Sequence, residues 1–388
     1  MTKRSRAVRE PVLGLQVVVL VDLLGLTLML PALPFHVLDL GGGGTGLGAV
    51  LASFSLAQFV AAPLWGRWSD RAGRRPLLLL SLAGSCLSLA AMALAPSVGW
   101  LVVARLLAGA CGGSIGVAHA LAADLTSVDR RTAAMGRLGM SVGAAFTVGP
   151  LLGALLAGAG FAAVAAAGAG LAALAFVLAW STIPRTPVER ADHAEPAARG
   201  TGRVWPLVVA VAAGMLALVG LESSVGLLAG TWFAAGPRFV GVVLAAAGLT
   251  MTVVQARPLV VAAARWGERR VALAAAACMV TGLALLPLTE PIAFAVVVAV
   301  VAASQGVLAT ACTSLLSRMS TTPRGRVMGR AQSGAAAARA IGPVLVGAGF
   351  DVTATAPVWI AASAAAAAGA AVALSAAPVE PDARLARG

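Results

Sequence analysis

Long apolar segments alternate with short polar ones along the 388 residues of this chain. Each apolar segment is long enough for a helix to cross about 30 Å of hydrocarbon, which takes roughly 18 residues or more. Backbone groups in lipid must bond within their own segment, so the pattern predicts helices and an all-α integral membrane protein. Twelve such spans are expected, at residues 12–35, 46–65, 77–95, 99–122, 134–158, 161–183, 204–230, 239–262, 270–288, 291–313, 327–349 and 353–376.

The composition excludes an ordinary soluble domain. Hydrophobic residues make up 60% of the chain, charged residues only 11%, and the mean hydropathy is +0.93. Soluble domains carry about a quarter charged residues. The four cysteines all fall inside expected spans, where they are interpreted as packing residues and not as disulfides or metal ligands. No metal or other cofactor is expected.

The net charge of +13 is confined almost entirely to every second polar segment. Apart from Arg238, the intervening loops contain no Lys or Arg. This distribution follows the positive-inside rule and predicts that both termini are cytoplasmic. It also argues against nucleic acid as the partner and favours the lipid bilayer. The basic segments lie near residues 3–9, 67–75, 130–137, 185–203, 265–270, 318–330 and 384–387.

The chain divides into two parts of six expected helices each. Residues 184–203 are rich in Pro, Arg and acidic residues and have no apolar periodicity, so we expect a cytoplasmic linker there. The predicted domains are an N-terminal six-helix bundle (1–183), the linker, a C-terminal six-helix bundle (204–377) and a cytoplasmic tail (378–388).

An internal repeat supports two pseudo-symmetric bundles, the arrangement of many secondary transporters. Each Gly-Pro pair follows a Met-Gly-Arg triplet, and the glycine of the pair lies thirteen positions after the glycine of the triplet. Residues of the first half recur in the second at an offset of 193 or 194: Gly149, Pro150, Gly73 and Arg75 correspond to Gly342, Pro343, Gly267 and Arg269.

The segment 66–75, GRWSDRAGRR, is a charged loop between two membrane-length helices. Its pattern resembles the loop between the second and third helices of the major facilitator superfamily. The resemblance implies a cytoplasmic gate. In that gate the aspartate of the loop lies at the N-terminus of the eleventh helix, and one of the arginines contacts an acid at the cytoplasmic end of the fourth helix. The alternative is that the arginines only set the orientation of the chain in the membrane. That alternative does not explain Asp70, because the positive-inside rule does not call for an acid there. The residues implied are Gly66, Asp70, Arg71, Gly73, Arg74, Arg75 and Asp124.

Ionisable residues deep inside a span are functional candidates by default. Asp22 and Glu222 are the only acids placed so deeply, and Arg105 lies well inside the span at 99–122. Asp22, with Gly25, Pro31 and Pro34, resembles the first helix of the tetracycline-exporter branch of drug:proton antiporters. The family pattern Arg-x-x-x-Gly matches Arg105 and Gly109, which implies a role in proton coupling, with Asp22 as a possible partner of Arg105.

The span at 134–158 resembles the antiporter motif Gly-x-x-x-Gly-Pro-x-x-Gly-Gly. Gly149, Pro150 and Gly153 are present, whereas Ala145 and Ala154 stand where glycine is usual. The chain also departs from the tetracycline exporters. The spans 77–95 and 270–288 lack the acids, and the span 239–262 lacks the histidine, that those exporters usually carry there. The resemblance therefore predicts the fold but not tetracycline as the substrate.

Together these features predict a monomeric transporter in the bacterial inner membrane that exports a small amphipathic or drug-like molecule in exchange for protons. Asp22, Glu222 and Arg105 would couple the protons. Glu222 could instead form a salt bridge to Arg257 or Arg339. One alternative is a metabolite facilitator of the same fold. Another is a membrane acyltransferase using His119 and Asp124, whose side chains would point about 140° apart on a straight helix. The expected substrate-cavity residues are Glu222, Gln255, Arg257 and Arg339.

Overall fold

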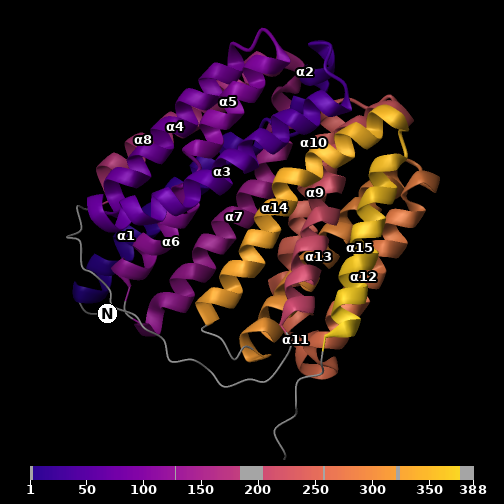
Figure 1. The fold of residues 1–388 in the computed structure, drawn as a ribbon. Coiled ribbons are helices and arrows are strands. Elements are labelled where there is room, and N and C mark those ends of the chain that lie inside the picture. Colours follow the sequence, from indigo (N-terminus) through magenta and orange to yellow (C-terminus); the bar gives the residue numbers. More distant parts are fainter. Residues whose placement is uncertain (1–2, 127, 184–203, 257, 320–323, 376–388) are drawn as a thin grey trace, which may run out of the picture.

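Helices make up the regular structure of this protein. The computed structural model describes residues 3–126, 128–183, 204–256, 258–319 and 324–375. Within those residues it contains α helices, two short 3-10 turns and no strand (Figure 1). The first half comprises α1 (Lys3–Thr27), α2 (Leu33–Asp39), α3 (Gly44–Ala72), α4 (Arg74–Ala93), α5 (Val98–Ala110), α6 (Ser114–Leu125), α7 (Val128–Leu156) and α8 (Phe161–Thr182). The second half comprises α9 (Trp205–Phe233), α10 (Pro237–Ala256), α11 (Pro258–Trp266), α12 (Glu268–Leu285), α13 (Pro291–Met319), α14 (Arg324–Val352) and α15 (Ala356–Leu374).

The all-helical membrane class is confirmed, although the number of full-length spans differs from the expected twelve. Within the described residues, eleven helices are long and apolar enough to cross a membrane. The expected first span instead appears as a shorter apolar helix, Leu13–Thr27, followed by a turn and then α2. Pro31 and Pro34 explain this break, because proline lacks the N–H of a helical bond and its ring crowds the preceding turn. The backbone between α1 and α2 turns more tightly than an α-helix, with Leu30 N bonded to Thr27 O at 3.1 Å.

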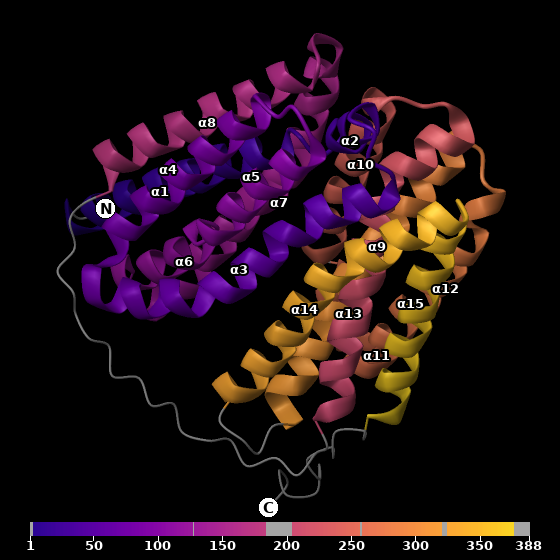
Figure 2. The same cartoon turned by 45° about the horizontal axis from the view of Figure 1, so that its top comes forward.

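Each half packs around buried residues of its own. The main core of the second half runs from Leu207 to Val372 and includes Phe294, which is fully buried. Two clusters fill the first half, and among the described residues Leu227 is the one buried side chain of the second half that joins them. Figures 1 and 2 show the halves side by side, the first in indigo to magenta and the second in red to yellow. The boundary predicted at 184–203 lies outside the described residues and stays a prediction.

The repeat seen in the sequence also appears as matching geometry. Gly73 and Gly267 precede α4 and α12 with φ of 88° and 83°, a region that favours glycine. Arg75 then donates to the carbonyl of Trp180 at 2.6 Å, and Arg269 donates to the carbonyl of Ala373 at 2.7 Å. In each half, an arginine at the start of one helix therefore fastens it to the end of the last helix. We call the end of the bundle that carries these two arginines the arginine end.

Candidate functional site

Asp22 is buried in the first half, with 5% of its surface exposed. The Ser114 hydroxyl donates to its Oδ2 at 2.8 Å, and the Ser85 hydroxyl also bonds to the carboxylate. Ser114 is the first residue of α6, just after the Gly112–Gly113 turn that separates α6 from α5. Two neutral hydroxyls thus surround this acid, and no ion pair to it occurs within the described part of the chain.

The suggested pairing of Asp22 with Arg105 is wrong. Arg105 lies on α5 with 4% of its surface exposed, and its Nε has no hydrogen-bond partner. Its guanidinium sits 5.3 Å from the ring centroid of Phe54 on α3, a cation–π contact. Packing explains the difference, because the α5–α6 break brings Ser114 rather than Arg105 to the acid. Arg105 is a buried cation without a carboxylate partner among the described residues.

Glu222 lies near the middle of α9 with an exposed side chain. It attracts Arg339 of α14 electrostatically, although no ion pair within 4.0 Å joins these two described side chains. Gln255, near the end of α10, lies against Gly306 of α13. Arg257 lies outside the described residues. An acid and a base therefore face each other across α9 and α14 without closing a salt bridge.

The expected gate residues separate into two groups. Arg74 Nε lies 3.2 Å from Asp124 Oδ2, an ion pair that joins the start of α4 to the end of α6, with 25% and 42% of the side chains exposed. Arg75 instead binds the Trp180 carbonyl and lies 5.4 Å from that ring, so it holds α4 to α8. Gly66, Asp70 and Arg71 are part of α3, but their side chains lie outside what the structure describes.

The glycines of the antiporter motif, Gly149 and Gly153, let α7 approach the C-terminal end of α1 closely. A Cβ at Gly149 would meet Thr27 Oγ1, and one at Gly153 would meet the Leu28 carbonyl. Thr27 Oγ1 also donates to Ala145 O at 3.0 Å, so the contact is hydrogen-bonded as well as tight. The motif therefore serves close packing within the first half, as small residues do between membrane helices.

Matching glycines join the two halves at the end opposite the arginine end. Gly241 of α10 packs on the Pro150 carbonyl of α7, and Gly48 of α3 packs on the Pro343 carbonyl of α14. The two glycines, Gly48 and Gly241, lie 193 positions apart, the same offset that separates Pro150 from Pro343. The repeated Gly-Pro pairs thus supply the carbonyls on which the other half docks. Figure 2 shows the ribbons of the two halves spreading apart toward the arginine end.

Sequence reasoning missed Asp351, which links the halves at this opposite end. The carboxylate, at the end of α14, accepts hydrogen bonds from Gly44 N at 2.7 Å, Thr45 N at 2.8 Å and the Thr45 hydroxyl at 2.5 Å. An anion is stabilised by the free N–H groups and the dipole at a helix N-terminus. The available signal was a lone acid within the expected loop 350–353, which has no basic residue.

One protein family matches more than half of this chain. The family model of the Major Facilitator Superfamily matches residues 17–260. The chain is 33% identical over 283 residues to tetracycline resistance protein class G of Vibrio anguillarum, covering 68% of the chain and 71% of that protein. It is 39% identical over 149 residues to the class D protein of Salmonella ordonez, a match that spans only 38% of each protein.

Solved structures share the fold over nearly the whole chain. The human organic anion transporter MFSD10 (TETRAN) has a TM-score of 0.68 and 24% identity, covering 94% of this chain and 99% of that one. The nucleoside transporter NupG has a TM-score of 0.77 and 12% identity, with the same coverage. At these identities the likeness is one of fold.

Proposed function

Because this chain belongs to the major facilitator superfamily, and is therefore a multi-pass membrane transporter and not an enzyme, we propose that it exports small amphipathic or drug-like molecules in exchange for protons. The matched tetracycline resistance proteins support the drug-like class. The chain lacks polar residues that the tetracycline exporters carry in three spans, so tetracycline itself is not proposed.

One observation carries the proton coupling: Asp22 is buried and bonded only to hydroxyl groups. A buried carboxylate that no cation compensates is costly, and a bound proton removes that cost. The serine hydroxyls stabilise the charged form when the proton leaves, so both forms have partners. Asp22 is thus suited to take up and release a proton as its surroundings change, and the buried, unpaired Arg105 supplies positive charge in the same half.

Transport would proceed by alternating access. The Gly48 and Gly241 contacts hold the halves together at one end, while the ribbons diverge at the other (Figure 2). In the opposite state these contacts would open, and the α3–α4 segment with Asp70 and Arg74, together with Asp124 of α6, would close the arginine end. From the positive-inside rule we expect that end and both termini to face the cytoplasm, with the chain in a bacterial inner membrane.

The substrate would meet Glu222 and Arg339 between the halves. Glu222 is exposed and unpaired at close range, so a cationic group on the substrate could replace Arg339 as its partner. Apolar residues make up most of α9, which favours amphipathic ligands over sugars or other richly hydroxylated metabolites.

The substrate class can be tested by measuring drug accumulation in a bacterial strain that lacks its own exporters. Expression of the chain should lower accumulation of amphipathic drugs, and Asp22→Asn should restore it at equal protein level. Unchanged accumulation of every drug, with a metabolite gradient that responds instead, would replace the proposal with a facilitator of the same fold.

A further inference from the structure

A cavity of about 510 Å³ lies within the second half, between α10, α11, α12 and α13. This volume falls in the range of ordinary small-molecule sites. Its lining includes none of the residues implicated in transport. All of its walls belong to one half, so it does not lie between the halves where the substrate is proposed to bind. The cavity is therefore separate from the proposed substrate site.

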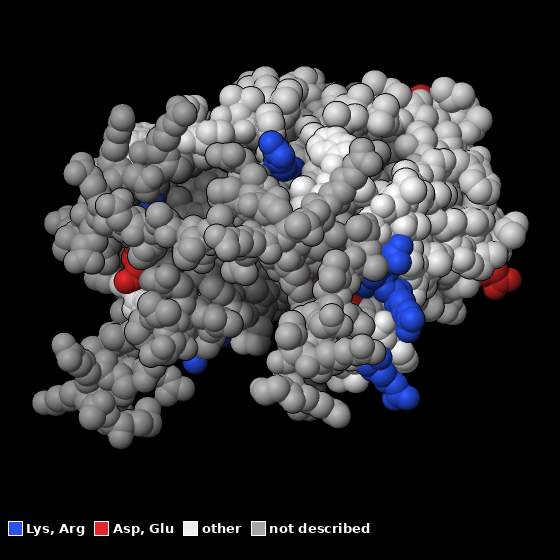
Figure 3. Space-filling view, turned by 60° about the horizontal axis from the view of Figure 1, so that its bottom comes forward, with Lys and Arg blue, Asp and Glu red and all other residues white. Residues whose placement is uncertain are grey.

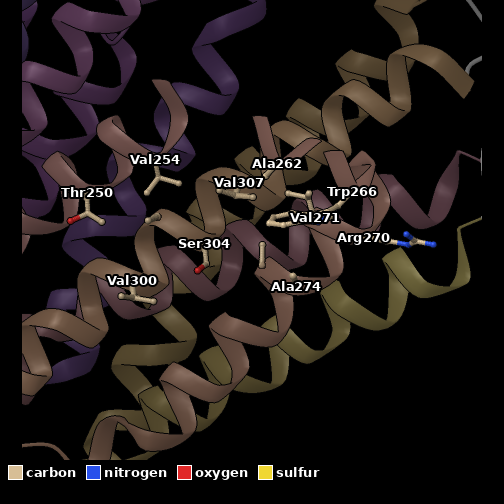
Figure 4. Close-up of a pocket in the computed structure, with 12 residues that line it drawn as sticks. Thr250, Val254, Ala262, Trp266, Arg270, Val271, Ala274, Val300, Ser304 and Val307 are labelled. Atoms are coloured by element: carbon tan, nitrogen blue, oxygen red, sulfur yellow. The ribbon is translucent and has the colours of Figure 1, made fainter. Parts of the chain in front are cut away.

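The lining is apolar along its length and cationic at one end. Figure 4 shows Thr250 and Arg270 at opposite ends of the lining, with Trp266 on the same side as Arg270. The Thr250 hydroxyl donates to Ala246 O of its own helix at 2.8 Å, so it adds little polarity. The other lining residues are Val254, Ala262, Val271, Ala274, Ala275, Val300, Ala303, Ser304 and Val307.

The cationic end coincides with the arginine end of the bundle. Arg270 is exposed there, and the Arg265 guanidinium lies 6.0 Å from the ring centroid of exposed Trp266. Figure 3 views this end and shows Lys and Arg side chains gathered on its right side. Tryptophan is enriched at the level of lipid headgroups, and basic residues between helices at this level attract anionic headgroups.

We propose that this groove binds one anionic phospholipid of the leaflet at the arginine end, its phosphate on Arg270 and an acyl chain along the apolar lining. A planar guanidinium can bond two phosphate oxygens at once. The apolar floor would exclude a hydrophilic anion such as free phosphate from the deeper part. The Glu268 carboxylate, two residues before Arg270, accepts a hydrogen bond from the Ser314 hydroxyl at 2.6 Å.

The test uses fluorescence quenching in nanodiscs of phosphatidylcholine that contain a small fraction of brominated phosphatidylglycerol or brominated phosphatidylcholine. The chain has eight tryptophans, so the Trp266 signal is the difference between each protein and its Trp266→Phe version. Phosphatidylglycerol should be preferred at Trp266 by about fivefold, as expected for one basic residue near an anionic surface. Arg270→Lys should keep most of this preference, and Arg270→Gln should abolish it.

Arg238→Gln is the matched control, because Arg238 begins α10 at the opposite end and should leave the preference unchanged. Equal quenching by both lipids in the wild-type protein would overturn the proposal. So would a preference that survives Arg270→Gln. If Arg270→Gln does not fold, equal quenching by both lipids in the wild-type protein would still overturn the proposal, since that comparison needs no altered arginine.

Discussion

The Asp351 carboxylate caps the helix that begins beside Thr45, more than 300 positions away in the sequence. It accepts both the backbone N–H and the hydroxyl of Thr45, at 2.8 and 2.5 Å. Because Asp351 ends α14 and Thr45 begins α3, this contact crosses from one half of the transporter to the other. It can form only while the halves are together at this end, so it stabilises the access state that the structure shows.

Asp351→Ala should shift the protein toward the opposite access state. The variant loses three hydrogen bonds to a charged acceptor. Because the site is exposed to solvent, these bonds together stabilise the present state by only roughly 1 to 2 kcal/mol, so their loss should change the ratio of the two states about five- to thirtyfold. Distances between spin labels at Leu38→Cys and Val352→Cys, both exposed, can report the shift once the four native cysteines are replaced. Thr45→Val removes only the hydroxyl and should have a smaller effect. Identical distance distributions in all three proteins would refute the role of this contact.

Gly48→Val and Gly241→Val should each prevent closure at the same end. Either side chain would press on a proline carbonyl of the other half, and backbone cannot move aside as a flexible side chain can. We expect transport to fall at least tenfold, and the label distance to lengthen. Gly170→Val is the control, because a Cβ there meets nothing within 4 Å. Full activity in both cross-half variants would show that the glycine contacts are dispensable.

Most of the architecture could be predicted from the sequence, because lipid forces apolar segments into helices and basic residues mark one side. Spacing also located the Gly-Pro repeat whose carbonyls join the halves. The side-chain partners could not be predicted in the same way. Asp22 meets Ser114 because the helix is interrupted between α5 and α6. The hydrophobic periodicity does not predict how this interruption turns α6 relative to α5. Asp351 and Thr45 meet only through the packing of distant helices.

Arg75→Ala should destabilise the protein more than Arg269→Ala. Both arginines donate to the last turn of a terminal helix, but Arg75 also lies over the Trp180 ring, whereas Arg269 meets Ala373. We expect losses of about 2 and about 1 kcal/mol, from one charged hydrogen bond with and without a cation–π contact. Thermal unfolding in detergent compares them directly. A larger loss for Arg269→Ala would show that the Trp180 contact contributes nothing.

Glu222→Gln should weaken transport of cationic drugs by about tenfold and spare neutral ones, because one charge-assisted contact is lost. Arg339→Gln provides the opposite test. It removes the cation that now attracts Glu222, so transport of cationic drugs should be kept or increased. Initial rates for matched cationic and neutral drugs in vesicles give both answers. Equal loss of both drug types in Glu222→Gln would exclude a role in charge selection.

Proton release from inverted vesicles with an acid interior tests the central claim most directly. Adding an exported drug should collapse the gradient in vesicles with wild-type protein, since each drug molecule that enters the lumen releases protons. Asp22→Asn should abolish the collapse while drug binding persists, because an amide cannot carry the proton. A collapse of equal rate in Asp22→Asn would contradict the role of Asp22, and no collapse with the wild-type protein, with drug uptake verified, would contradict proton-coupled export itself.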